Sequence, residues 1–111
     1  MPEAVVFLNG RLVPASQAHL AIYDAGIVLG ATVTEMTRTF RQQPFRLEDH
    51  IDRLFQSLKY TRMEIGLSKE ELLAASHELL SHNFGLERIV QHHLQTMRGM
   101  FIELIQHLRV L

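Results

Sequence analysis

The spacing of apolar residues predicts an amphipathic helix near the middle of this chain of 111 residues. The apolar positions recur every three or four residues and are closed by one long basic side chain: Leu47, Ile51, Leu54, Phe55, Leu58 and Arg62. At roughly 100° per residue, Arg53 falls about 200° from Ile51, on the side away from this stripe, together with His50 and Ser57. Arg53 therefore points away from the predicted core, and we expect water, a ligand or another domain to receive its charge.

The residues before this helix have the patterns of strands and turns. Asn9-Gly10, between the apolar runs 4–8 and 11–13, is typical of a two-residue β-hairpin turn. The threonine-rich run 31–40 predicts a longer strand, because β-branched residues favour strands. It is followed by a turn at 41–43 and an edge strand at 44–46.

The connection between the hairpin and the long strand is less regular. Residues 20–23 predict a brief strand before Asp24-Ala25-Gly26. Residues 27–30 are apolar and end in glycine, so we expect a tight, buried connection there.

Two further helices are predicted after the central one. Ser68 and Glu71 form a capping box that opens a helix ending at Asn83 or Gly85. From residue 86 onward, seven apolar residues are spaced alternately four and three apart, which is a heptad pattern: Val90, Leu94, Met97, Phe101, Leu104, Leu108 and Leu111. The predicted fold is α+β: a strand-rich N-terminal half with hairpins packs with two helices over residues 1–83, and residues 84–111 add a divergent helical tail.

Composition and charge exclude several classes of protein. The net charge of −1, with acidic and basic residues interspersed, argues against binding to nucleic acid. The absence of cysteine excludes disulfides and thiolate metal sites. No apolar run is long enough for a membrane span, and the N-terminus lacks the pattern of a signal peptide. We therefore expect a soluble, cytoplasmic protein without a membrane partner.

The candidate chemistry centres on His50 and Arg53, three residues apart on one helix face. An arginine fork matches the oxygens of a phosphate or carboxylate, so the pair could form an anion site. The alternative is a solvated face on which Asp49 pairs with Arg53. The spacing of His92, His93 and His107 fits no metal-ligand motif, so no metal site is predicted.

No acid/base pair or nucleophile motif emerges from the remaining residues. The four acidic residues considered for a paired acid and base are not brought together by any local pattern: Asp24, Glu35, Glu48 and Asp52. We therefore predict no catalytic residue within this chain.

Four motifs in order resemble the N-terminal domain of class IV (fold type IV) aminotransferases. They are NGR at 9–11, DAG at 24–26, Gly30 followed by VTE at 33–35, and FRLEDHIDRL at 45–54. This family includes branched-chain aminotransferase, D-amino acid aminotransferase and aminodeoxychorismate lyase, and the resemblance runs from about Val5 to about Asn83. It implies transfer of an amino group between an amino acid and a 2-oxo acid, with pyridoxal 5′-phosphate as cofactor.

The resemblance also implies roles for two residues. Arg53, in the His-x-x-Arg-Leu pattern, would bind the cofactor's 5′-phosphate across a domain interface. Thr34 takes the place of an aromatic residue that usually lines the substrate pocket. Gly30-Ala31-Thr32 replaces the usual Gly-x-Gly, and Ala25 replaces the arginine of a DRG motif, so both motifs depart from the family pattern.

The family's covalent anchor for the cofactor is a lysine in a larger C-terminal domain, and no lysine here matches its motif. The chain contains only Lys59 and Lys69. We therefore expect this chain alone not to transaminate.

Residues 84–111 depart from the family sequence, and three explanations are open for them. The chain is a truncated or frame-shifted product, a natural short variant, or a subunit that completes its site with another chain. Truncation is the favoured explanation. The alternative function is that of a non-catalytic remnant that self-associates, as a homodimer for example, through its C-terminal helix.

Overall fold

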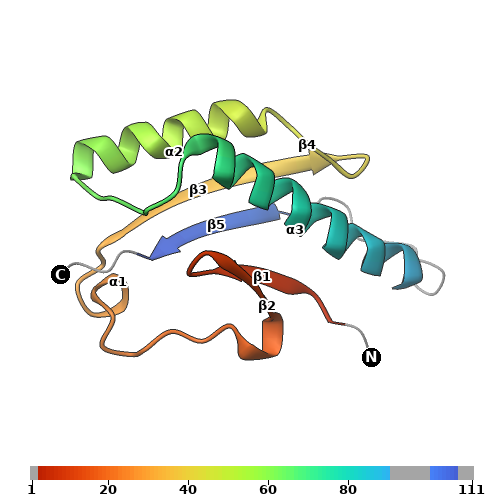
Figure 1. The fold of residues 1–111 in the computed structure, drawn as a ribbon, viewed down its shortest axis with the longest axis horizontal. Helices are drawn as coiled ribbons and strands as arrows, with labels where there is room; N and C mark the ends of the chain where they lie inside the picture. Colours follow the sequence, from red (N-terminus) through yellow and green to blue (C-terminus); the bar gives the residue numbers. More distant parts are fainter. Residues whose placement is uncertain (1–2, 91–100, 108–111) are drawn as a thin grey trace.

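The computed structural model of the chain describes residues 3–90 and 101–107, with side chains from residue 3 to residue 85. A short 3-10 turn, Ala15–Gln17, follows the first two strands. The other elements, in chain order, are β1 (Val5–Leu8), β2 (Arg11–Pro14), α1 (Ala25–Val28), β3 (Thr32–Phe40), β4 (Gln43–Pro44), α2 (Leu47–Thr61), α3 (Lys69–Val90) and β5 (Phe101–His107). Figure 1 shows α2 running alongside β3, with α3 between α2 and the β1–β2 hairpin. This mixture of hairpins and helices confirms the predicted α+β class.

Two tight turns set the strand pairing. Asn9 and Gly10 both have positive φ angles, 51° and 83°, as a two-residue turn of the predicted kind requires. The turn pairs Val6 with Val13 in an antiparallel hairpin. Arg41 and Gln42, with φ angles of 49° and 62°, make a second such turn that pairs β3 with β4. The hairpin predicted at Asn9-Gly10 is confirmed.

The core lies between α2, α3 and one face of β3. Its buried apolar side chains come mainly from the predicted stripe of α2 and one residue of α3: Leu47, Ile51, Leu54, Leu58 and Leu72. Helix α2 ends before Arg62, which has a positive φ of 57° and donates its backbone N–H to the Leu58 and Lys59 carbonyls. Arg62 is therefore outside the helix, and it does not close the apolar stripe as predicted.

Strand β3 has one buried and one exposed face. Glu35, Thr37 and Thr39 are buried on the face that packs on α2. Met36 and Phe40, on the other face, are about half exposed. The buried face is thus rich in polar groups, which need partners inside the fold.

The connection between the hairpin and β3 differs from its prediction. Residues 20–23 do not form a strand, and Ile27, Val28 and Leu29 are exposed instead of buried. The physical reason is local: the Asp24 side chain accepts a hydrogen bond from the Gly26 N–H at 2.8 Å and caps the single helical turn α1. This turn takes the place of the tight connection and leaves its apolar side chains outside the core.

The edge strand after the second turn is shorter than predicted. β4 contains only Gln43 and Pro44, and Arg46 has a positive φ of 53° at the start of α2. The chain therefore turns into the helix one residue after Phe45, whose N–H bonds the Arg38 carbonyl at 2.7 Å.

The extra C-terminal helix predicted for residues 84–111 is wrong for residues 101–107, and the helix before it does not end at Asn83 or Gly85 as predicted. Helix α3 continues past Asn83 to Val90 with Gly85 inside it, and residues 101–107 form the strand β5. β5 pairs antiparallel with β3, from Thr32 opposite His107 to Arg38 opposite Phe101. A strand at this edge satisfies backbone N–H and C=O groups of β3 that a helix cannot pair. Residues 91–100 and 108–111 of the predicted heptad lie outside the described residues.

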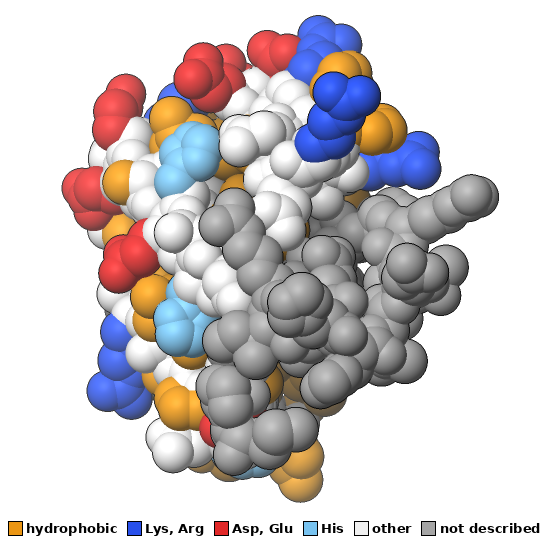
Figure 2. All heavy atoms as spheres, turned by 90° about the vertical axis from the view of Figure 1, so that its right-hand side faces the viewer, with side chains coloured by type: hydrophobic (Ala, Val, Ile, Leu, Met, Phe, Trp, Pro, Cys, Tyr) orange, Lys and Arg blue, Asp and Glu red, His pale blue; other side chains and the backbone are white. Residues whose placement is uncertain are grey.

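On the face of the molecule shown in Figure 2, charged side chains of both signs are visible. In Figure 2, acidic side chains lie along one margin of the face shown, and lysine and arginine side chains gather at another. Among the described helices, none has an apolar stretch that could cross a lipid bilayer.

Candidate functional site

Three polar side chains meet between α2 and β3, which run alongside each other. Glu35 of β3 accepts hydrogen bonds from Arg53 and His50 of α2. Arg53 Nε donates to Glu35 Oε2 at 2.8 Å, and Arg53 Nη2 donates to Glu35 Oε1. His50 Nδ1 lies 2.7 Å from the same Oε1 atom. We call Glu35, His50 and Arg53 the Glu35 cluster.

The cluster connects the interior to the surface. Only 4% of the Glu35 side chain is exposed, whereas 23% of His50 and 66% of Arg53 are exposed. Glu35 is buried because it lies on the face of β3 that packs on α2, whereas its neighbours Thr34 and Met36 lie on the opposite, exposed face. His50 and Arg53 lie one helical turn apart, so both reach the same carboxylate.

The charges in the cluster stabilise one another. The hydrogen bond from Arg53 holds the pKa of Glu35 at about 2, against an ordinary value of 4.5; burial opposes this shift, and His50 reinforces it. The hydrogen bond to Glu35 in turn raises the pKa of Arg53. Glu35 is thus a carboxylate and Arg53 a cation at neutral pH.

Within the described part of the chain, one edge of the Arg53 guanidinium remains for another partner. Its Nε and Nη2 atoms each donate one hydrogen bond to Glu35, whereas a guanidinium offers five N–H donors. The remaining donors belong to a side chain that is two thirds exposed. This geometry suits an anion with several oxygens, such as a phosphate or a carboxylate.

The sequence placed Arg53 correctly but missed Glu35 as its partner. Arg53 points away from the apolar stripe, as predicted. The prediction that water, a ligand or another domain receives its charge is wrong for one edge of the guanidinium, because Glu35 of the same domain accepts two of its hydrogen bonds. The alternative pairing of Asp49 with Arg53 is wrong: Asp49 Oδ2 pairs with Arg46 Nε at 2.7 Å. The observation that could have revealed Glu35 is the alternation along 33–39, which puts a carboxylate on the buried face beside the helix.

Thr34 is not brought together with Arg53. It lies on β3 next to Glu35, on the opposite, exposed face of the strand. Its backbone pairs in register with Ile105 of β5. A role for Thr34 in a substrate pocket remains a prediction.

The two lysines lie on α2 and α3. Lys69 Nζ is 3.0 Å from Asp52 Oδ1 and 5.9 Å from the centre of the Phe55 ring. Lys59 is in the last turn of α2. Asp52 thus pairs with a lysine, and Asp24 caps α1, so neither belongs to an acid/base pair with Glu35.

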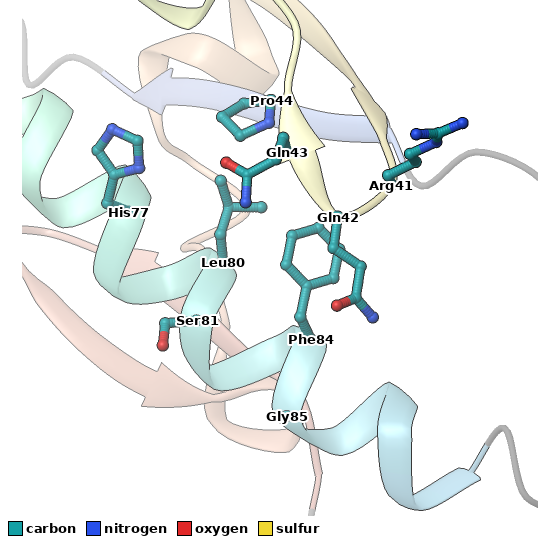
Figure 3. A pocket seen from close by; sticks show the side chains of 9 residues that line it. All are labelled: Arg41, Gln42, Gln43, Pro44, His77, Leu80, Ser81, Phe84 and Gly85. Carbon is teal, nitrogen blue, oxygen red and sulfur yellow. The ribbon is translucent and has the colours of Figure 1, made fainter.

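A separate hollow of about 340 Å³ lies between the β3–β4 turn and α3. Figure 3 shows Leu80 and Phe84 on its helical wall, with Gln43 and Pro44 opposite and the Arg41 side chain extending away. His77 is the only titratable side chain besides Arg41 among its lining residues. The described residues that line this hollow therefore supply no acid/base pair. Within the described part of the chain, no group of three or more histidine or acidic residues is placed to hold a metal ion.

The sequence is similar to curated aminotransferases and to a curated aminodeoxychorismate lyase. It is 36% identical over 78 residues to a putative branched-chain-amino-acid aminotransferase of Methanocaldococcus jannaschii, covering 70% of this chain and 27% of that protein. It is 35% identical over 79 residues to the aminodeoxychorismate lyase of Bacillus subtilis, covering 71% of this chain and 27% of that protein. The chain thus spans a little over a quarter of the length of these relatives. No protein-family model matches it.

The fold is similar to solved branched-chain aminotransferases. The structure from Thermoproteus uzoniensis with norvaline superposes with a TM-score of 0.74 at 23% identity, covering 98% of this chain and 35% of that chain. A second branched-chain amino acid aminotransferase, solved in complex with N-(5′-phosphopyridoxyl)-L-glutamate, superposes with a TM-score of 0.72 at 28% identity, covering 91% of this chain and 31% of that chain. The resemblance predicted from the motifs is confirmed: in sequence and in fold, the chain matches the N-terminal domain of class IV (fold type IV) aminotransferases.

Proposed function

We propose that this chain supplies the phosphate-binding arginine of a branched-chain aminotransferase-like enzyme. In this proposal Arg53 binds the 5′-phosphate of pyridoxal phosphate. The observation that carries it is the geometry of Arg53, which is held by Glu35 on one edge and exposed over 66% of its side chain. Pyridoxal phosphate supplies the electron sink for moving an amino group between an amino acid and a 2-oxo acid.

The residues present fit part of such a site. An exposed guanidinium next to a histidine suits a phosphate dianion, and a structurally similar aminotransferase was solved in complex with a phosphopyridoxyl compound. Thr34 is a candidate wall of the substrate pocket. The branched-chain substrate class, a homodimeric assembly and a cytoplasmic location are further parts of the proposal.

We also propose that the chain alone does not catalyse transamination. Of its two lysines, Lys69 forms an ion pair with Asp52, and neither lysine lies in the family's catalytic motif. Incubation of the pure chain with pyridoxal phosphate, a 2-oxo acid and either a branched-chain or a D-amino acid is expected to give no turnover. Measurable formation of the new amino acid would overturn this part of the proposal.

Binding of the phosphate group can be measured without covalent chemistry. Pyridoxine 5′-phosphate and pyridoxine lack the aldehyde, so they do not react with amino groups. We expect the chain to bind the phosphorylated compound more tightly, and Arg53→Ala to remove this preference, because an arginine–phosphate contact is lost. Arg11→Ala, which removes an exposed arginine on β2, is the matched control. Equal preference in the chain and in Arg53→Ala would exclude Arg53 as the phosphate ligand.

The exposed apolar residues around α1 favour a second candidate function, self-association. Ile22 and Tyr23 are 85% and 84% exposed, and Leu29 is 79% exposed. Apolar side chains gathered in one short segment are characteristic of an interaction surface. Sedimentation of the chain and of Ile22→Ser/Leu29→Ser is expected to show an assembly that the double variant weakens. Monomers at all concentrations in both proteins would exclude it.

A further inference from the structure

The ion pair between Arg53 and Glu35 joins an exposed side chain to a buried one. The Glu35 side chain is 4% exposed and fixed to the backbone of β3, whereas Arg53 extends from α2 into solvent. An exposed arginine normally samples many rotamers, and ordering it in a complex costs free energy. Two hydrogen bonds to one buried carboxylate order the guanidinium before any ligand arrives.

We infer that Glu35 is a positioning residue of the phosphate site, holding Arg53 by one edge so that its other edge faces an incoming phosphate. This inference rests on the proposed function, since it assigns a further residue to the same site. Glu35 makes its contacts with Arg53 and His50 and acts on the phosphate only through them.

His50 is ordered by the same carboxylate. Because Glu35 stays ionised, with its pKa held at about 2, it can only accept hydrogen bonds. The His50 Nδ1 atom, 2.7 Å from Oε1, is therefore the donor of that hydrogen bond, and Nε2 is the nitrogen left for other contacts. One buried residue thus fixes two side chains on successive turns of α2.

A positioning role and a simple charge effect predict different phosphate affinities for two variants of Glu35. Glu35 partly neutralises Arg53, so if charge alone mattered, removing the carboxylate in Glu35→Gln would strengthen phosphate binding, and the charge-conserving Glu35→Asp would leave it unchanged. If Glu35 positions Arg53, both variants weaken it. Glu35→Asp keeps the charge but loses one methylene of reach, and Glu35→Gln places an amide N–H₂ against the donors of Arg53.

The experiment measures the ratio of the dissociation constants of pyridoxine and pyridoxine 5′-phosphate in the full chain. We expect this ratio to fall by about threefold to tenfold in both Glu35→Asp and Glu35→Gln, which is the cost of re-ordering one long side chain. Glu48→Gln, at an exposed position in the first turn of α2, is the matched control and should keep the ratio of the unsubstituted chain.

The outcomes separate this inference from the proposed function. If Arg53→Ala brings the ratio of dissociation constants to about one while both Glu35 variants keep or raise it, the positioning role is wrong and the phosphate site stands. If the unsubstituted chain does not prefer the phosphorylated compound, the phosphate site itself is wrong.

A measurement on the unsubstituted chain covers the case in which the Glu35 variants fail to fold. Nitrogen-15 NMR should show the Arg53 Nε–H as a resolved signal with slowed solvent exchange. A signal averaged with those of the other exposed arginines would overturn the positioning role.

Discussion

Two buried polar residues on the same face of β3, Glu35 and Thr37, differ in the hydrogen bonds that their side chains make. Glu35 is satisfied by Arg53 and His50. Thr37, two residues further along, is fully buried, and its Oγ1 is the buried side-chain polar atom that lacks a hydrogen-bond partner among the described residues. The first arrangement stabilises the fold in its ionised form, and the second carries an uncompensated desolvation cost.

Glu35 makes the stability depend on pH in the acidic range. Its pKa is lowered from 4.5 to about 2 on folding, so its contribution is fully present above about pH 4.5 and is lost as the pH falls toward 2. Between pH 7 and pH 3 this loss is on the order of 2 kcal/mol. Urea unfolding at both values should show a smaller drop in Glu35→Gln than in the unsubstituted chain. Equal drops would show that the pKa of Glu35 does not change on folding.

Thr37→Val should be neutral or stabilising. The valine keeps the shape of threonine and removes a hydroxyl that has no partner among the described residues, so we expect a gain in unfolding free energy of about 0–1 kcal/mol. Thr39→Val, at the next inward position of β3, is the control, because Thr39 does interact with its surroundings. Thermal unfolding of both variants tests this; a loss of about 2 kcal/mol or more in Thr37→Val would show that its hydroxyl is satisfied.

Two of the three residues of the Glu35 cluster, His50 and Arg53, could be predicted from the sequence. The helical period alone determines that Arg53 and His50 share a side of α2, because that relation is local. Their pairing with Glu35 joins residues 18 and 15 positions apart, and it depends on how the helix packs on the strand. Neither the register of that packing nor the burial of Glu35 follows from a local pattern.

Helix α3 is joined to the N-terminal hairpin by one side chain. Asn83 Oδ1 accepts from the Val5 N–H at 2.9 Å, and Asn83 Nδ2 donates to the Val5 carbonyl at 3.1 Å. Its amide thus takes the place of a neighbouring strand at the outer edge of β1. It satisfies two backbone groups that an open edge would leave unpaired.

Asn83→Ala should loosen this junction. Losing both hydrogen bonds is expected to lower the unfolding free energy by about 1–2 kcal/mol. Hydrogen exchange at the Val5 amide should accelerate more than exchange within α2. His82→Ala, at an exposed position on the same helix, is the control and should leave both quantities unchanged. Slow exchange at Val5 in Asn83→Ala would mean that another group protects it.

Local patterns predicted some elements well and failed for others. The hairpin at Asn9-Gly10 and the helix over 47–61 follow from turn chemistry and from the 3.6-residue period. Strand β5 was mistaken for a helix because apolar residues spaced three and four apart do not exclude a strand, and its pairing with β3 is long-range. The exposure of α1 was missed because an apolar run does not reveal whether the domain's own core covers it.

The whole domain depends on a small core. Five buried leucine and isoleucine residues from α2 and α3 form its main cluster. A domain of this size is stable by only about 5–15 kcal/mol, so each of these side chains is a large part of the total.

Leu54→Ala should destabilise the entire domain instead of α2 alone. Leu54 is fully buried, and truncation is expected to cost about 2–5 kcal/mol because a cavity remains. Circular dichroism and hydrogen exchange should report a lower melting temperature for helices and strands together. Gln56→Ala, at an exposed position two residues away, is the control. Melting of α2 before the strands would contradict a single cooperative core.

The bond between Asn83 and Val5 also has a consequence for synthesis on the ribosome. The two residues are 78 positions apart, so at 5–20 residues per second Val5 precedes Asn83 on the ribosome by roughly 4–16 s. During that interval the outer edge of β1 is open to strands of other nascent chains. Asn83→Ala would remove this pairing permanently, so its cost should appear in the yield of folded protein from translation as well as in the stability of the finished domain.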